Sequence, residues 1–300
     1  MRVLLAVDGS ESSTYAADAV GFLDSVESVT VLHVIDLPRL GYPMLGPDVG
    51  KDLGWEIEQA IREEGAQVLQ RTMSQMAHHP FQILKRLEEG TPSELVLSVA
   101  EEEHADMIVL GSRGVGQVHE FFLGSVSHQV LTHAACSVCI VNTPVGQIER
   151  ILIPVQGFED VERAKQVLLK HPFADHAEMT VFTVVPIPRS IFRAGVSASE
   201  TKVQRALESA EEFIDAAVGE LKECSYAVVG LFGLGDPAGT ILEQAAQSKS
   251  DLILMGAHHP SAVTRIVLGS VSHTVLHRTQ CPVMLIRGKR NGYVKYPLSR

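Results

Sequence analysis

The feature that most constrains the fold is an internal repeat, because the second half of this 300-residue chain resembles the first. The sequence RVLLAVD at Arg2–Asp8 matches RILIPVQ at Arg150–Gln156, 148 residues later. The sequence LGSVSH occurs twice without change, at Leu123–His128 and at Leu268–His273, 145 residues apart. The separation between matching segments changes from 148 to 145 residues, and such small changes are expected where the loops of a duplicated domain differ in length. We therefore expect two domains of similar fold and a short basic tail: 1–145, 146–288 and 289–300.

Apolar runs alternate with helical patterns along the first domain. Five runs have the length and the flanking residues of strands: Val3–Val7, Val29–Ile35, Phe81–Leu87, Met107–Leu110 and Cys136–Val141. The third run is more polar than the others, so we expect it at an edge of the sheet. Strands that alternate with helices indicate a parallel, doubly wound α/β sheet.

Two helix starts can be placed from local sequence. Ser12 or Ser13 is expected to cap a helix that reaches about Asp24. The stretch Asp36–Gly54 is rich in Pro and Gly, so we expect a long loop there, of the kind that lies over a site or a partner surface. The next helix is then expected over Trp55–Ala77.

A glycine-rich segment follows the fourth expected strand and leads into a helix. Its spacing is Gly111-x2-Gly114-x9-Gly124-Ser125. The free N–H groups and the dipole of a helix N-terminus favour an anion, and glycine lets a phosphate approach the backbone. Parallel-sheet proteins bind their ligands beyond the carboxyl ends of the strands, where this segment lies. The spacing therefore predicts a phosphate site, although a turn and a helix start that bind nothing would also use glycine.

This spacing resembles the nucleotide-binding signature of the universal stress protein family, Gly-x2-Gly-x9-Gly-(Ser/Thr), and the resemblance covers nearly the whole chain as two copies. It implies two tandem, five-stranded, Rossmann-like domains with strand order 3-2-1-4-5. Many family members bind ATP, so it also implies ATP, together with Mg²⁺, as the ligand. Family domains commonly associate through their fifth strands, here Val138–Val141 and Val283–Ile286. We expect the two halves to pack face to face as an intramolecular pseudo-dimer.

The resemblance also implies which residues of the first domain meet the nucleotide. Those at the adenosine are Ala6, Asp8 and Val34. Those around the ribose and phosphates are Gly111, Arg113, Gly114, Gly124, Ser125, Val126 and Ser127. Leu110, directly before Gly111, is also assigned to the nucleotide site. Arg113 would add a cation, and the two serines would add hydroxyl donors. Asp8 could instead serve only as a turn or helix-capping carboxylate.

The second domain departs from the signature. Gln156 stands where the first domain has Asp8, and His258 and His259 stand where it has Arg113 and Gly114. If the position of Gly114 needs a positive φ, His259 at the matching position costs about 1 kcal/mol and places a Cβ where a phosphate would approach. We therefore expect one ATP per chain, in the first domain. Adjacent histidines also lack the spacing of a metal-ligand pair on one helix face, so we expect no metal site.

The cysteine pattern offers a redox alternative. Cys136-x2-Cys139 has the spacing of a redox motif, but in the second half Cys281 repeats the first cysteine while Met284 replaces the second. That substitution favours two core positions of a strand. The 4 cysteines are also too few and too scattered for a disulfide scaffold.

Composition narrows the class of protein. The chain is 45% hydrophobic and 20% charged, as is typical of soluble globular proteins. A net charge of −11 argues against a nucleic-acid partner. The first apolar run is too short for a signal peptide, and no run approaches the ~20 residues of a membrane span, so we expect a cytoplasmic protein without membrane contact. The basic tail is expected to be solvated, with docking to an anionic partner as the alternative.

These observations predict a binding protein rather than an enzyme. The chain has neither the P-loop sequence GxxxxGK[ST] nor the SGGxDS loop of adenylating enzymes, and we assign no catalytic residue. We expect an ATP-binding stress-response or regulatory protein with slow or no hydrolysis of ATP. We also expect that it acts on an unidentified protein partner, with a homodimer as one form of assembly. One alternative is an enzyme that uses this ATP to adenylate or phosphorylate a small molecule near Asp8. The other is an interaction module without nucleotide.

Overall fold

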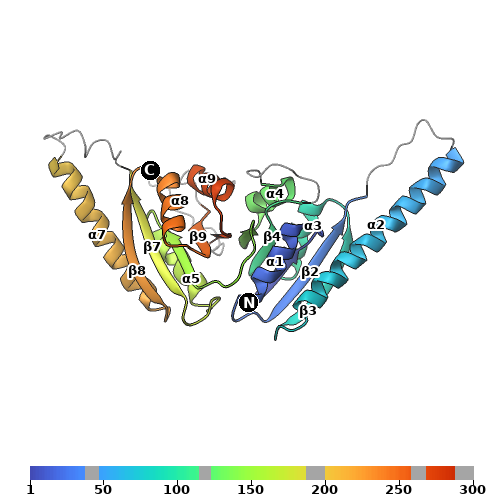
Figure 1. Cartoon of the computed structure of the whole chain (residues 1–300), viewed down its shortest axis with the longest axis horizontal. Coiled ribbons are helices and arrows are strands. Elements are labelled where there is room, and N and C mark those ends of the chain that lie inside the picture. The colour runs from blue at the N-terminus through green and yellow to red at the C-terminus, as the bar shows by residue number, and fades with distance from the viewer. Residues whose placement is uncertain (38–46, 115–122, 187–199, 258–267, 288–300) are drawn as a thin grey trace, which may run out of the picture.

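The computed structural model of the chain describes residues 1–37, 47–114, 123–186, 200–257 and 268–287. Its strands form one ten-stranded sheet in the order β3-β2-β1-β4-β5-β10-β9-β6-β7-β8, with helices on both faces (Figure 1). The strands are β1 Arg2–Ala6, β2 Ser28–Ile35, β3 Gln82–Glu89, β4 Met107–Gly111, β5 Ser137–Val141, β6 Arg150–Pro154, β7 Glu178–Val185, β8 Ala227–Leu234, β9 Leu252–Gly256 and β10 Val283–Ile286. The helices are α1 Glu11–Gly21, α2 Pro47–Met76, α3 Pro92–Glu102, α4 Ser125–His133, α5 Phe158–Leu168, α7 Glu200–Lys222, α8 Pro237–Gln247 and α9 Ser270–Arg278.

Each half of the sheet has the strand order 3-2-1-4-5, and neighbouring strands within each half are parallel. This confirms the predicted doubly wound α/β fold and its duplication. The predicted edge position of the third strand is also confirmed, because β3 and its counterpart β8 form the two outer edges of the sheet. The long helices α2 and α7 lie beside these edges, at the two ends of the molecule (Figure 1).

The two halves are joined through their fifth strands. β5 and β10 pair antiparallel, with Val138 opposite Leu285 and Ile140 opposite Val283. The predicted pseudo-dimer is therefore confirmed, but the expected face-to-face packing is wrong, since the half-sheets meet edge to edge. Helices already cover both faces of each half, so the unpaired backbone of the fifth strand is the surface that still needs a partner.

The hydrophobic core also continues from one half into the other. One cluster of buried side chains lies on the face covered by α1, α2, α5 and α7, and includes Val141 and Ile286 at the junction. A second cluster lies on the face covered by α3, α4, α8 and α9, and includes Val138 and Leu285. Because both clusters cross the junction, separating the halves would expose apolar surface on both faces of the sheet.

Polar contacts also connect the two halves near the N-terminal end of β4. The Lys170 ammonium, just beyond α5, lies 2.5 Å from a carboxylate oxygen of Asp106. Burial raises the pKa of Asp106, but hydrogen bonds from Lys170 and from the Arg2 N–H outweigh it, so this pKa lies below its ordinary value. Nearby, the Asp24 N–H donates to the Pro172 carbonyl at 2.9 Å.

Two local expectations are wrong. Ser10, rather than Ser12 or Ser13, is the N-cap of α1, and its hydroxyl accepts a hydrogen bond from the Ser13 N–H. Helix α2 begins at Pro47 rather than Trp55, so the expected loop is shorter. The proline lies in the first turn, where a helix needs no N–H donor, and so the Pro signal marked a helix start instead of a loop.

Among the helices that the structure describes, none is both long enough and apolar enough to cross a membrane. The predicted basic tail, 289–300, lies outside the described residues.

Candidate functional site

The candidate site lies where β1 and β4 end side by side in the centre of the first half-sheet. Ala6 pairs with Leu110 at the carboxyl ends of these strands. The chain leaves β1 into α1 on one face and leaves β4 toward α4 on the other, so this is the switch point of a doubly wound sheet. Crevices at such points are where open α/β sheets bind ligands.

Asp8 and Gly114 meet at this point. One carboxylate oxygen of Asp8 accepts a hydrogen bond of 3.0 Å from the Ser10 N–H, which makes Asp8 a turn-forming residue. The other oxygen faces the loop after β4, since a Cβ built on Gly114 would lie 2.7 Å from it. Asp8 is exposed. The carboxylate therefore serves the turn through one oxygen and still presents the other oxygen to the glycine loop.

Gly111 is required by the packing of α1. A Cβ at Gly111 would lie 2.7 Å from the backbone carbonyl carbon of Ser12, so only glycine fits where the first turn of α1 crosses the end of β4. The same turn holds the loop in place. The hydroxyls of Ser10 and Ser12 donate to the Arg113 carbonyl at 3.2 and 2.5 Å. Our sequence reasoning did not assign Ser10 or Ser12 to the site, because their contacts cross about one hundred residues of chain.

Helix α4 directs its N-terminus toward the same loop. Its N-cap is Gly124, which makes no side-chain capping hydrogen bond, and the first helical residue, Ser125, is exposed. The Gly124 N–H donates to the Ser112 carbonyl at 2.8 Å, and a Cβ on Gly124 would lie 3.4 Å from that oxygen. The glycine thus brings the helix start close to the loop, and the N–H groups of the first turn remain without a capping side chain.

Ser127 has a structural role at this site. Its side chain is buried, and its hydroxyl donates to the Gly111 carbonyl at 2.8 Å. In the second domain, Ser272 donates in the same way to the Gly256 carbonyl at 3.2 Å. Because this bond is kept where the rest of the signature is lost, it fixes the helix to the strand end. A ligand would meet the backbone of Ser127 rather than its hydroxyl.

An apolar surface adjoins the loop. Ala6, Val34 and Val126 are partly exposed and pack against the core cluster under α3 and α4. Leu110 belongs to that cluster and is only 3% exposed, so it supports this surface from below. The structure therefore brings the predicted site residues together around one end of the sheet. Residues 115–122, within the signature, lie outside the described part of the chain.

The matching position in the second domain holds a carboxylate. Asp160 stands where the first domain has Ser12, 148 residues earlier, and a Cβ on Gly256 would lie 2.6 Å from its oxygen. Asp160 accepts hydrogen bonds from the Gln156 N–H at 2.9 Å and from Arg163 at 3.3 Å. Arg163 neutralises this carboxylate, and its Nη1 lies 3.8 Å from the same Cβ position, so an ion pair occupies the space beside Gly256. The repeat offset of 148 residues pairs Ser12 with Asp160, so the sequence itself carries this signal.

Neither the metal nor the redox alternative gains support from the described residues. They contain no group of three or more His, Cys, Asp or Glu side chains that could hold a metal, and His258 and His259 lie outside them. Cys136 and Cys139 pack against the core clusters on opposite faces of the sheet, so they cannot meet in a disulfide. Burial raises the pKa of Cys136 to about 11 and that of Cys139 to about 12.

Comparisons with known proteins show the family and the fold of this chain. The model of the family described as "Universal stress protein family" matches residues 1–142 and 147–287. Universal stress protein Rv2005c of Mycobacterium tuberculosis is 27% identical over 307 aligned residues, covering 95% of this chain and 96% of that protein. Universal stress protein YxiE of Bacillus subtilis is 31% identical and covers 47% of this chain and 97% of its own length. The crystal structure of a universal stress protein from Archaeoglobus fulgidus has a TM-score of 0.60 at 22% identity, and the alignment covers 95% of this chain and 98% of that one, which shows the same fold.

Proposed function

The chain belongs to the universal stress protein family, and on that premise we propose that it is a stress-response or regulatory protein that binds one ATP in its first domain. The observation that carries this proposal is the meeting of Asp8, Gly114 and the uncapped start of α4 at the switch point of the first half-sheet. A carboxylate can accept hydrogen bonds from a ribose or a base, and a helix N-terminus with an accessible backbone can bind phosphates.

Each part of the nucleotide has a partner in this arrangement. The adenosine would lie against the partly exposed apolar side chains of Ala6, Val34 and Val126, with Asp8 accepting a hydrogen bond from a hydroxyl or amino group. The triphosphate would take the N–H groups of the glycine loop and of the first turn of α4, where the helix dipole favours negative charge. Arg113 supplies a permanent positive charge in the same loop.

A magnesium ion would accompany the nucleotide rather than bind the protein first. The described residues offer no cluster of three metal-ligating side chains, and Mg²⁺ commonly binds through phosphate oxygens and water. At the candidate site one oxygen of Asp8 accepts the Ser10 N–H, and the other faces the glycine loop, where we assign it to the adenosine rather than to a water. This assignment leaves the site without a designated general base, so slow or absent hydrolysis is part of the proposal.

The test is to identify what the purified protein retains and then to titrate it. Denaturing the purified protein should release ATP, which mass spectrometry would identify. Calorimetry on nucleotide-free protein with Mg·ATP should then give one site per chain. Single-turnover assays should show ADP or AMP forming no faster than the slow background, with or without small-molecule acceptors. Fast turnover with an acceptor would favour the enzyme alternative. No binding of ATP at millimolar concentration would favour the interaction module without nucleotide.

A further inference from the structure

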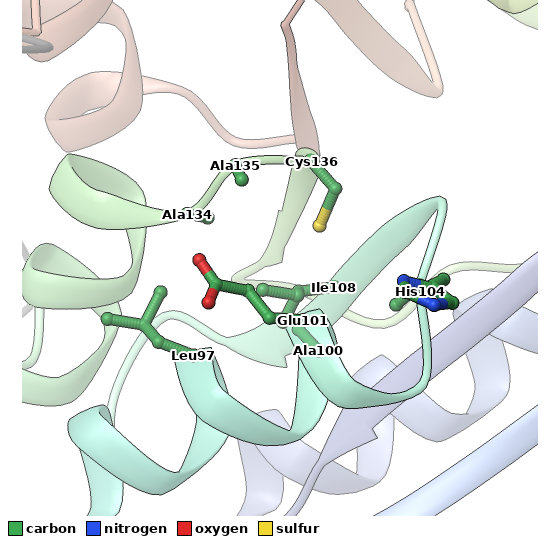
Figure 2. A pocket seen from close by; sticks show the side chains of 9 residues that line it. Leu97, Ala100, Glu101, His104, Ile108, Ala134, Ala135 and Cys136 are labelled. Atoms are coloured by element: carbon green, nitrogen blue, oxygen red, sulfur yellow. The ribbon is translucent and has the colours of Figure 1, made fainter. Parts of the chain in front are cut away.

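A cavity lies at the opposite end of β4 from the glycine loop. It has a volume of about 340 Å³ and opens between the C-terminal ends of α3 and α4 (Figure 2). Its apolar walls come from Leu97, Ala100, Ile108 and Ala134, and the thiol of Cys136 points into it. This volume and this mainly apolar lining fall in the range of small-molecule sites.

The duplicated domain provides an internal comparison for this cavity. At the positions that match Ala134 and Ala135, the second domain has Thr279 and Gln280, 145 residues later. The Thr279 hydroxyl lies 3.2 Å from the Cys281 N–H, so the larger side chain is built into the local turn. The first domain therefore has two small alanines where the second domain has larger polar side chains.

The cavity carries one acidic group that the fold does not neutralise. Helix α3 ends in three consecutive carboxylates, and Arg86 pairs with two of them, at 2.7 Å from Glu102 and 3.2 Å from Glu103. Glu101 forms no such ion pair with any residue of the described chain, and its carboxylate points into the cavity beneath Ala134 (Figure 2). Glu101 is exposed at the mouth of this cavity, so its carboxylate is open to a cation that enters beside the apolar walls.

The helix ends add to the same preference. The last turn of α3 contains no basic residue, and the C-terminal end of a helix dipole favours a cation. The protein itself places a cation at the neighbouring helix end, where the Arg287 guanidinium donates to the Leu131 carbonyl of α4. The thiol of Cys136 remains neutral at pH 7, because burial raises its pKa to about 11. The Arg287 guanidinium acts on that thiol as a positive charge, so a bound cation would pair at the Glu101 end of the cavity.

We propose that this cavity binds a small organic cation, a primary ammonium on a compact apolar body, with Glu101 pairing the ammonium and the alanine-lined walls holding the body. The ligand would span the gap between the ends of α3 and α4. This inference is independent of the nucleotide site, which lies at the other end of β4.

The test uses a matched pair of probes on the full chain, 2-phenylethylammonium and its neutral isostere 2-phenylethanol. Calorimetry at pH 7 should show the ammonium binding at least tenfold more tightly, and methyl NMR signals of Leu97 and Ile108 should shift. Glu101→Gln should reduce the ammonium affinity to that of the alcohol. Ala135→Gln, which imports the residue of the second domain, should weaken both probes at least tenfold.

The control is Glu94→Gln, which removes an exposed carboxylate from the first turn of the same helix and should change neither titration. Circular dichroism would confirm that each variant is folded, and ATP should not displace the ammonium. Equal affinity for the two probes, no binding of either, an unchanged titration for Glu101→Gln, or displacement by ATP would each overturn the proposal. Apart from displacement by ATP, none of these outcomes depends on whether the first domain binds ATP.

Discussion

The Asp8 carboxylate and the Gly114 backbone face each other across the end of the first half-sheet, so close that a Cβ on Gly114 would lie 2.7 Å from the carboxylate oxygen. These residues are far apart in sequence, and two neighbouring parallel strands bring them together. The relationship explains why the loop needs a glycine here even before a ligand is considered. It also means that a side chain at this position would act on both groups proposed to hold the nucleotide.

Gly114→His, which imports the residue of the second domain, should abolish ATP binding. The imidazole would occupy the space beside Asp8 and block the approach of phosphate to the backbone. We expect a loss of at least two decades in affinity, or about 2.7 kcal/mol, measured by calorimetry. The control is Gly146→Ala, because a Cβ there would meet nothing within 4 Å. An unchanged titration for Gly114→His would remove this loop from the site.

Asp8→Asn should weaken ATP binding while leaving the turn intact. The amide oxygen of Asn can still accept the Ser10 N–H, so the fold should persist. The lost charge-assisted hydrogen bond should cost about 1.5–3 kcal/mol, or roughly 10- to 150-fold in affinity. Calorimetry gives the affinity and thermal unfolding gives the stability. If the melting temperature falls and the affinity does not, Asp8 is a turn residue only.

Gly256→Ala in the second domain should leave the ATP titration unchanged. The new methyl group would press on the Asp160 carboxylate, which lies 2.6 Å from the ideal Cβ position, so a modest loss of stability is expected there. The nucleotide should still bind once per chain, in the first domain. Two equivalent sites in the parent protein, or a lost site in this variant, would contradict the assignment.

Lys170→Gln should lower the free energy of unfolding in a pH-dependent way. The folded-state pKa of Asp106 lies below its ordinary value, with Lys170 as one cause, so the stability from this contact is fully present above the unfolded pKa and is lost as pH falls through the folded pKa. At pH 7 we expect a loss of about 0.5–1 kcal/mol, since the pair is partly exposed, and below the folded pKa we expect no difference. Urea titrations at pH 7 and at a pH below the folded pKa of Asp106 would measure this difference in the free energy of unfolding. Lys85→Gln on the edge strand β3 is the control. A loss that is equal at both pH values would rule out the ion pair as its cause.

The cysteines of β5 and its approach should resist alkylation. With a pKa of about 11, Cys136 carries about one hundredth of the thiolate of an ordinary cysteine at pH 7.5, and Cys139 is buried. Iodoacetamide should therefore label both residues slowly in the folded protein and rapidly in urea, as followed by mass spectrometry. Rapid labelling of Cys136 in the folded state, or a Cys136–Cys139 disulfide, would restore the redox interpretation.

The sequence by itself determined the fold class, because its signals are local. The apolar runs and the recurrence of LGSVSH predicted strands, helices and two domains, and the bounds of β1, β2, β4 and β5 agree with the predictions to within about one residue. The local signal failed at Pro47, where one residue suits both a loop and the first turn of a helix.

Only the tertiary structure decided how distant residues meet. The site depends on Ser12 crossing Gly111 and on Ser10 holding the Arg113 carbonyl, and these contacts arise from the parallel pairing of β1 with β4. The resemblance predicted contact through the fifth strands, but only the structure showed that β5 and β10 meet edge to edge, because the helices leave that edge uncovered. Sequence patterns indicate which face of each segment is buried. Which other segment packs against that face depends on the packing of the whole chain.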